Sequence, residues 1–230
     1  MNSHAQRKLS TTVARQVILG VAGIGLVAFI VAHLAGNLFI YGGPEVFNAY
    51  AQKLHDLGAL LWLARAGLIA IFVLHVYYTA KLWLENRAAR GAQRYAITKR
   101  SAERPWGTRS MIYTGALIFV FVFVHLFDFT FVDKSGKLSE IGGESLGLYG
   151  VVFNRYAYSF WRAPFYIVTM ICLGLHLSHA VSSVTVTLGT EDSTLVKRAD
   201  IAAKMAGAVI AVGFSSIPIY VLLKAHVLSS

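Results

Sequence analysis

Five long apolar blocks, separated by polar segments, dominate the hydropathy pattern of the chain. The blocks are continuously apolar and do not alternate with polar residues, which favours helices in lipid over the strands of a membrane barrel. A helix needs about 20 apolar residues to cross the hydrocarbon core of a bilayer. The pattern therefore predicts a bundle of five transmembrane helices at about 16–40, 58–84, 109–130, 162–188 and 203–225.

A shorter amphipathic segment follows the first apolar block. Gly43-Pro44 can open a helix, because proline is tolerated at the first helical position. From Val46 to Leu57, apolar residues then recur at helical spacing opposite polar ones. This pattern predicts a helix at about 44–57 that lies at the membrane interface. No repeat or second domain is visible, so residues 1–230 are predicted to form one membrane domain.

The composition supports a membrane protein. Hydrophobic residues make up 56% of the chain and charged residues 14%, against a usual charged share of roughly 25% in soluble domains. The single cysteine, Cys172, excludes a disulfide framework, a four-cysteine metal site and covalent c-type haem attachment. The basic residues that give the chain its net charge of +10 lie between the apolar blocks. We therefore expect cationic loops and no nucleic-acid partner.

The distribution of basic residues predicts the orientation. If the N-terminus is cytoplasmic, two thirds of the 21 Lys and Arg residues fall on the cytoplasmic side. The basic segment 81–109 contributes most to this bias. By the positive-inside rule, the chain is a multi-pass protein of the cytoplasmic (inner) membrane with its C-terminus outside. Arg65 and Arg162, near span ends, are predicted to extend outward toward the membrane surface.

Histidines are the main candidates for chemistry within the spans. Ionisable residues are costly in hydrocarbon, so each is a functional candidate. A single one is equally well explained as a packing residue that donates to a carbonyl. Their spread over four successive spans favours a shared role instead. The five are His33, His75, His125, His176 and His179.

The predicted topology sorts these histidines into two layers. His33 lies about 25 Å along the first span and His125 about 22 Å along the third, and both spans run outward. His75 lies near the inner end of the second span, as does His176 or His179 on the fourth. The sequence therefore predicts two histidine pairs, one above the other.

Two neutral imidazoles from different helices suit the axial positions of a low-spin haem iron. Zinc or copper is the alternative, but a closed structural site would gather its ligands at one depth. Small residues such as Gly36 and Gly174 lie beside histidines and would let a macrocycle approach the backbone. Two stacked haems would carry electrons across the bilayer.

Haem propionates are anionic and call for nearby cations. Arg15 precedes His33 by 18 residues, which is five helical turns, so both lie on one helix face. Lys81 and Arg109 are the other candidates near the inner surface. Each of the three is also explained as an anchor that follows the positive-inside rule.

Short motifs around the histidines occur together in one known family. They are His33-Leu34-x-x-Asn37, Glu45-x-Phe47-Asn48, His75 and His125 near span ends, and His176-Leu177-Ser178 leading to Thr187-Leu188-Gly189. With these motifs the chain resembles the cytochrome b558-type membrane subunit of succinate:quinone oxidoreductases. That group includes dihaem, five-helix succinate dehydrogenases and fumarate reductases. Each motif is short, and the set together is specific.

The resemblance implies two haem b groups and assigns their ligands. His33 and His125 would bind the outer haem iron, and His75 and His176 the inner one. Asn37 would lie near a haem or the quinone, and His179 would be a packing residue or a hydrogen-bond partner of a ligand.

The resemblance also implies partner subunits that bind an iron–sulfur cluster and a flavin. This chain cannot bind either cofactor itself, since it has no cysteine cluster and no dinucleotide fingerprint. A flavoprotein subunit would interconvert succinate and fumarate, and an iron–sulfur subunit would pass electrons to the inner haem. Both would lie on the cytoplasmic side, with the basic segment 81–109 as a docking surface. The chain itself would be the quinone-reactive anchor, with menaquinone favoured.

Quinone chemistry also requires a proton carrier. His55 follows the first span and titrates near neutral pH, so it is the candidate for quinone protonation. Two other functions fit a helical membrane protein with histidines: a haem-free transporter that relays protons, and a passive anchor for soluble subunits. A transporter would favour broken helices and an internal repeat. Pro218 is the only proline in the interior of a span, since Pro164 stands at the very start of the fourth.

Overall fold

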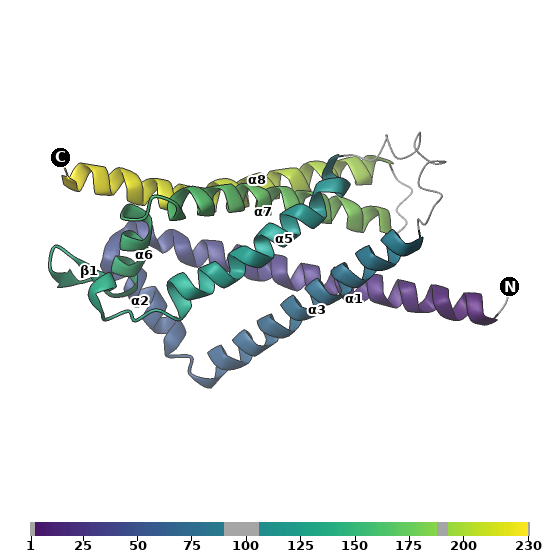
Figure 1. Cartoon of the computed structure of the whole chain (residues 1–230), viewed down its shortest axis with the longest axis horizontal. Coiled ribbons are helices and arrows are strands. Elements are labelled where there is room, and N and C mark those ends of the chain that lie inside the picture. Colours follow the sequence, from purple (N-terminus) through teal and green to yellow (C-terminus); the bar gives the residue numbers. More distant parts are fainter. Residues whose placement is uncertain (1–2, 90–105, 188–192, 230) are drawn as a thin grey trace. The chain divides into compact units, whose positions relative to one another are not determined.

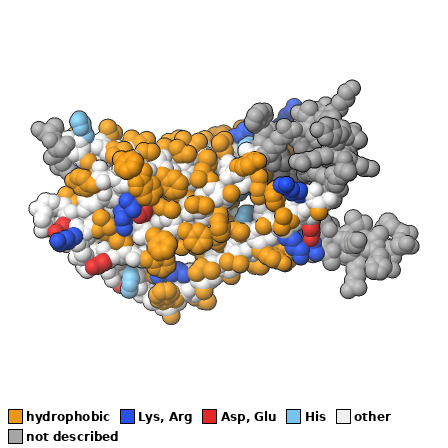
Figure 2. Space-filling model, viewed as in Figure 1, with side chains coloured by type: hydrophobic (Ala, Val, Ile, Leu, Met, Phe, Trp, Pro, Cys, Tyr) orange, Lys and Arg blue, Asp and Glu red, His pale blue; other side chains and the backbone are white. Residues whose placement is uncertain are grey.

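The computed structural model describes residues 3–89, 106–187 and 193–229. Within these residues, five helices are long and apolar enough to cross a membrane, so the prediction of a predominantly helical multi-pass membrane protein is confirmed. Hydrophobic side chains cover most of the surface drawn in Figure 2. The helices with these properties are α1 (Ser3–Asn37, continued through α2), α3 (Ala59–Ala89), α5 (Trp106–His125), α7 (Arg162–Thr187) and α8 (Ser193–Ser229), as shown in Figure 1.

Two of these helices begin well before their predicted spans. α1 begins 13 residues and α8 ten residues earlier than predicted from hydropathy. The early part of α8 is charged, and Lys204 pairs with Asp200 one turn before it at 2.6 Å. Such pairs support helical turns outside an apolar environment. The hydropathy pattern located the lipid-embedded part of each helix and not its full length.

A turn and a short helix connect α1 to α3. The 3-10 helix η1 (Leu38–Gly42) leads into α2 (Gly43–His55), which confirms the helix predicted at 44–57. Gly43 has a φ of 87°, a conformation that favours glycine, and Pro44 follows in the first turn of α2. Phe47 is the buried residue of α2.

The connection between α5 and α7 contains elements that the sequence analysis did not identify. The chain continues past α5 as a π-helix, η3 (Leu126–Thr130), and later forms the 3-10 turn η4 (Lys137–Ser139). Strands β1 (Glu140–Ile141) and β2 (Glu144–Ser145) then pair antiparallel, with Glu140 opposite Ser145. Helix α6 (Gly147–Ala157) follows. The hairpin turn is Gly142-Gly143, with φ values of 63° and 86°, a two-glycine signal that predicts such a turn.

Contacts within the described residues divide the chain into two units, one made of residues 1–30 and 57–104 and the other of 31–56 and 105–230. The prediction of a single domain stays a prediction. In the first unit, Arg15 on α1 forms an ion pair with Glu85 on α3, with Nη1 and Oε1 2.9 Å apart. Gly25 lies close to Ile71, where an added Cβ would be 3.1 Å from the Ile71 Cδ1.

The second unit contains the principal core. α7 and α8 pack closely at two glycines, because a Cβ on Gly174 would lie 2.8 Å from the Cβ of Ala211 and against the carbonyl of Gly207. This is the small-residue contact that lets membrane helices approach. A cluster of buried aromatic and aliphatic side chains lies where α2, α6, α7 and α8 meet, and includes Phe47, Tyr149, Phe153, Tyr156, Tyr166, Ile217 and Val221.

Candidate functional site

The structure brings His33 and His125 together within the second unit. His33 lies near the end of α1 and His125 is the last residue of α5. Their ring centroids are 5.7 Å apart, with ring planes at 89°. The two residues that the depth argument paired are therefore neighbours, 92 residues apart in the chain.

Local contacts fix the backbone on the His33 side. The side-chain amide of Asn37 donates to the carbonyl oxygen of His33 at 2.8 Å, which holds the last turn of α1. Leu34 packs against α8, where a Cβ on Gly213 would be 2.8 Å from its Cδ2. Asn37, a predicted cofactor-binding residue, thus contacts the backbone of a candidate ligand in this structure.

Aromatic side chains surround the His33–His125 pair. Phe121 stacks on His125 at 5.5 Å between centroids, and Phe129 lies at 5.3 Å. Tyr166 lies 6.2 Å from His125, and Phe214 lies 5.9 Å from His33. The Nδ1 atom of His125 is buried and has no hydrogen-bond partner among the described residues. An apolar, aromatic environment of this kind favours neutral imidazoles.

His176 on α7 is held by a hydroxyl group. Its Nδ1 lies 3.0 Å from the Thr114 Oγ1, which is also 3.1 Å from the carbonyl oxygens of Ser110 and Met111. When the hydroxyl donates to one of these carbonyls, its oxygen accepts from the Nδ1–H of His176. That tautomer leaves the Nε2 lone pair of His176 for a metal ion. Gly115 adjoins the ring, since an added Cβ would be 3.3 Å from its Cε1.

His75 lies in the first unit and faces Gly23. An added Cβ on Gly23 would be 4.0 Å from both Cε1 and Nδ1 of the ring. The Nδ1 atom of His75 is buried without a hydrogen-bond partner in the described part of the chain, and so is that of His179. A buried unpaired nitrogen therefore does not by itself separate the candidate ligand His75 from His179.

Two glycines that were expected to accommodate a macrocycle contact protein side chains or backbone instead. A Cβ on Gly36 would lie 2.6 Å from the Cε1 of Tyr50, so the Tyr50 ring covers this position. Gly174 contacts Gly207 at the packed crossing of α7 and α8. At both positions the small residue serves helix packing. The sequence pattern of small residues beside histidines does not distinguish these two uses.

The predicted basic residues have separate surroundings. Arg15 is engaged with Glu85, a residue that the sequence analysis did not single out. Lys81 lies over the Tyr77 ring, with its Nζ 5.7 Å from the centroid. The side chain of Arg109 lies outside the described residues. His55 is exposed at the end of α2. Their roles toward a haem or quinone stay predictions.

A buried carboxylate, Asp128 on η3, is the clearest polar feature that the sequence analysis missed. Its side chain is 4% exposed and accepts from the Arg162 Nε, at 3.0 Å to Oδ1 and 3.2 Å to Oδ2. Tyr166 donates to Oδ2 at 3.1 Å, and the Arg155 Nε lies 3.5 Å from Oδ1. Arg162 was predicted to extend outward; it points at this carboxylate because an unpaired buried charge is far more costly.

Sequence signals for this cluster exist. Asp128 is an acidic residue at the end of an otherwise uncharged apolar block, and such a residue is expected to have a partner. The partners lie on α6 and at the start of α7, so the chain must fold before they meet. Burial, together with the negative charge of Asp128, also raises the pKa of the nearby phenol of Tyr156.

Among the described residues, no three or more His, Cys, Asp or Glu side chains are grouped so as to hold a metal ion. Comparison with known proteins adds no further assignment: no family model, no curated protein and no solved structure matches the chain.

Proposed function

We propose that this chain is a dihaem b-type cytochrome and the membrane anchor of a succinate:quinone oxidoreductase. It would pass electrons between an iron–sulfur partner subunit and a membrane quinone, with menaquinone favoured. The observation that supports this proposal best is the His33–His125 pair at 5.7 Å between ring centroids.

The pair would supply two ligands of one iron. His33 and His125 would hold the haem iron through their ring nitrogens, one from α1 and one from α5. The aromatic residues around His125 favour the neutral rings that ligation requires. A haem bound there supplies reversible one-electron transfer, and the chain supplies its orientation and its apolar surroundings.

The second pair, His75 and His176, rests on the sequence analysis. Its best support in the structure is the hydrogen bond between His176 Nδ1 and Thr114 Oγ1, which orients the ring. With the proton on Nδ1, Nε2 would be the ligating atom. The N-terminus would be cytoplasmic. The flavoprotein and iron–sulfur subunits would bind on that side, near the basic segment 81–109.

The remaining candidate residues would act at the edges of these sites. Arg15, Lys81 and Arg109 would neutralise propionates, and Arg15 would then share its guanidinium between a propionate and Glu85. His55 would exchange protons with the quinone from the end of α2. Asn37 would hold the backbone of His33 through the bond to its carbonyl.

Visible spectroscopy tests the proposal directly. The full chain, purified from haem-replete cells, should show a reduced-minus-oxidised spectrum of b-type haem and two haems per chain by the pyridine haemochrome assay. His125→Ala and His176→Ala should each lose one haem, because each removes one axial ligand. His226→Ala is the matched control, since His226 is not a proposed ligand, and it should retain two haems.

Two results would refute the proposal. A folded, monodisperse chain without haem would favour the transporter or the passive anchor. Retention of both haems by His33→Ala and His125→Ala would show that the observed pair is not the ligand set.

A further inference from the structure

The Asp128 cluster carries more positive than negative charge. One carboxylate faces two guanidinium groups, from Arg155 and Arg162. Arg162 makes two hydrogen bonds to it, whereas the Nε of Arg155 is buried and makes none among the described residues. Asp128 is thus already satisfied by Arg162 and Tyr166, and the charge of Arg155 is compensated less well. A second anion near Arg155 would balance the cluster.

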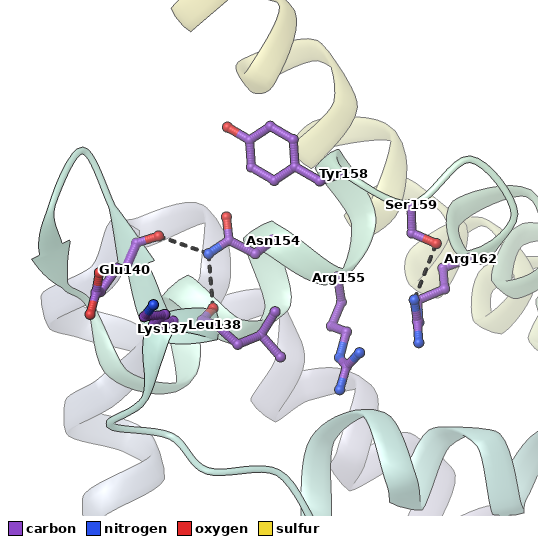
Figure 3. Close-up of a pocket in the computed structure, with 8 residues that line it drawn as sticks. All are labelled: Lys137, Leu138, Glu140, Asn154, Arg155, Tyr158, Ser159 and Arg162. Atoms are coloured by element: carbon purple, nitrogen blue, oxygen red, sulfur yellow. Dashed lines mark hydrogen bonds between the residues drawn. The ribbon is translucent and has the colours of Figure 1, made fainter.

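An open pocket of about 380 Å³ adjoins this cluster, and both arginines line it. Figure 3 shows the two guanidinium groups extending in the same direction, from α6 and from the start of α7. Lys137 lines the pocket from η4, and Glu140 lies across it from the arginines. Three cations and one carboxylate therefore line the pocket, which is a lining suited to an anion.

The loop wall of the pocket is held in place by hydrogen bonds. The side-chain amide of Asn154 donates to the carbonyl oxygens of Leu138 and Glu140, both at 2.8 Å. Ser159 accepts from the Arg162 Nη1 at 3.2 Å. These contacts order the backbone beside Lys137 and the guanidinium group of Arg162 before any ligand binds. A preordered group of donors loses less entropy on binding.

The pocket lies at the end of membrane-spanning segments. One candidate span ends at Thr130 and another begins at Arg162. If both cross the bilayer, the pocket lies at the boundary between hydrocarbon and headgroups. Aromatic side chains project nearby: Tyr158 is 78% and Phe160 92% exposed. Exposed aromatic residues beside basic ones are typical of the headgroup level. An anion available at this level is the phosphate of an anionic phospholipid.

We propose that this pocket binds the phosphate of an anionic phospholipid headgroup, with Arg155, Arg162 and Lys137 as its ligands. The guanidinium of Arg155 is the main determinant, because its charge is the least compensated one. The exposed rings of Tyr158 and Phe160 would contact the acyl chains below. This site is independent of the histidine pairs and of the proposed electron transfer.

Native mass spectrometry of the purified full chain tests this site. The chain in detergent is titrated with phosphatidylglycerol or with phosphatidylcholine, and retained lipid is counted. We expect one phosphatidylglycerol to bind in preference to phosphatidylcholine. Arg155→Gln should weaken that binding about tenfold, the effect of losing a charge-assisted hydrogen bond. Arg155→Lys should recover part of it, because the charge returns without the planar fork.

Two further variants separate this site from general attraction to anionic lipid. Lys137→Gln changes an exposed loop residue, so folding should be unaffected while phosphatidylglycerol binding weakens. Arg65→Gln is the matched control. Arg65 is an exposed arginine near the end of a span, beside Trp62 at 4.9 Å, and its removal should change binding less than twofold.

Equal retention of the two lipids, or equal weakening by Arg65→Gln and Arg155→Gln, would overturn the proposal. A titration with inorganic phosphate alone identifies the source of the anion. Phosphate binding that depends on Arg155, without a preference for phosphatidylglycerol, would assign the pocket to free phosphate and overturn the lipid assignment.

Discussion

Asp128 shows what a single charged residue requires at the end of an apolar helix. The chain leaves the α-helical path after His125 and forms a π-helical turn, η3, which carries Asp128. π-helical turns are rare and are frequently found at functional sites. Here the wider turn places the carboxylate where Arg155, Arg162 and Tyr166 reach it. The cost of burying this charge is offset by partners from two other elements.

Asp128→Asn should destabilise the chain by about 2–4 kcal/mol, because two partly buried guanidinium groups lose their counter-ion. The arginine side chains are 21% and 23% exposed, so water reduces the effect below that of a fully buried pair. Thermal unfolding in detergent measures it as a lower Tm. Glu144→Gln is the control, because Glu144 is exposed and a surface change should stay within about 0.5 kcal/mol. Equal shifts in the two variants would contradict this account.

At the scale of elements, glycines set how closely helices approach. Gly174 and Gly207 face each other across α7 and α8, and an added Cβ on either would contact the backbone of the other helix. Gly67 on α3 has nothing within 4 Å of an added Cβ. The same residue type is therefore essential at one position and replaceable at another.

Gly174→Ala should lower the Tm, since overpacking a tight crossing costs roughly 1–3 kcal/mol. Gly67→Ala should leave the Tm unchanged or raise it, because alanine favours the helix where space is open. The two variants are compared by thermal unfolding in the same detergent. A stabilising effect of Gly174→Ala would mean that the two helices are not in close contact in solution.

Elements with a strong local pattern were predicted from the sequence, whereas the hairpin, despite its Gly142-Gly143 signal, and α6 were not. A span is specified by about 20 consecutive residues, and α2 by its amphipathic spacing, so both appear in the local pattern. The hairpin and α6 are short elements, and the hydrogen bonds of Asn48 tie α6 to α2, at 2.9 Å to the Leu146 carbonyl and 3.1 Å from the Tyr149 amide. These contacts join residues about 100 positions apart, which no local pattern reveals.

In the candidate site, too, some features follow from the local sequence and others depend on how distant segments pack. Depth along the spans brought His33 and His125 to one layer, because helical rise is fixed. The partners of Asp128 depend on how the 128–162 connection folds, and the contacts of Gly36 and Gly174 depend on which helices pack there. Residue type and spacing alone do not determine such contacts.

At the scale of the whole molecule, the number of spans determines the sides on which the termini lie. Five crossings would place the two ends on opposite faces of the membrane, and the positive-inside rule predicts a cytoplasmic N-terminus. The single cysteine makes this testable, because Cys172→Ala leaves a chain without thiols. A cysteine introduced near either terminus is then the only thiol in the chain.

In the Cys172→Ala background, Ser229→Cys should react with a membrane-impermeant maleimide in cells whose cytoplasmic membrane is intact and whose outer envelope admits the reagent. Ser3→Cys should react only after the cells are lysed, since its thiol would face the cytoplasm. Labelling is read as a mass shift on a gel, and Cys172→Ala without added cysteine is the control. The reverse pattern would invert the proposed orientation, and labelling of both before lysis would contradict an odd number of spans.

The length of α8 has a practical consequence. Its 37 residues extend about 55 Å at 1.5 Å per residue, against about 30 Å of hydrocarbon. Even a tilted α8 must therefore project from the bilayer, and its charged turns around Lys197, Arg198 and Asp200 mark the projecting end. A rigid helical domain could be fused near Ser193 so that its helix continues α8 without a break. It would add mass outside the detergent micelle. Particles of this small membrane protein could then be aligned by electron cryomicroscopy.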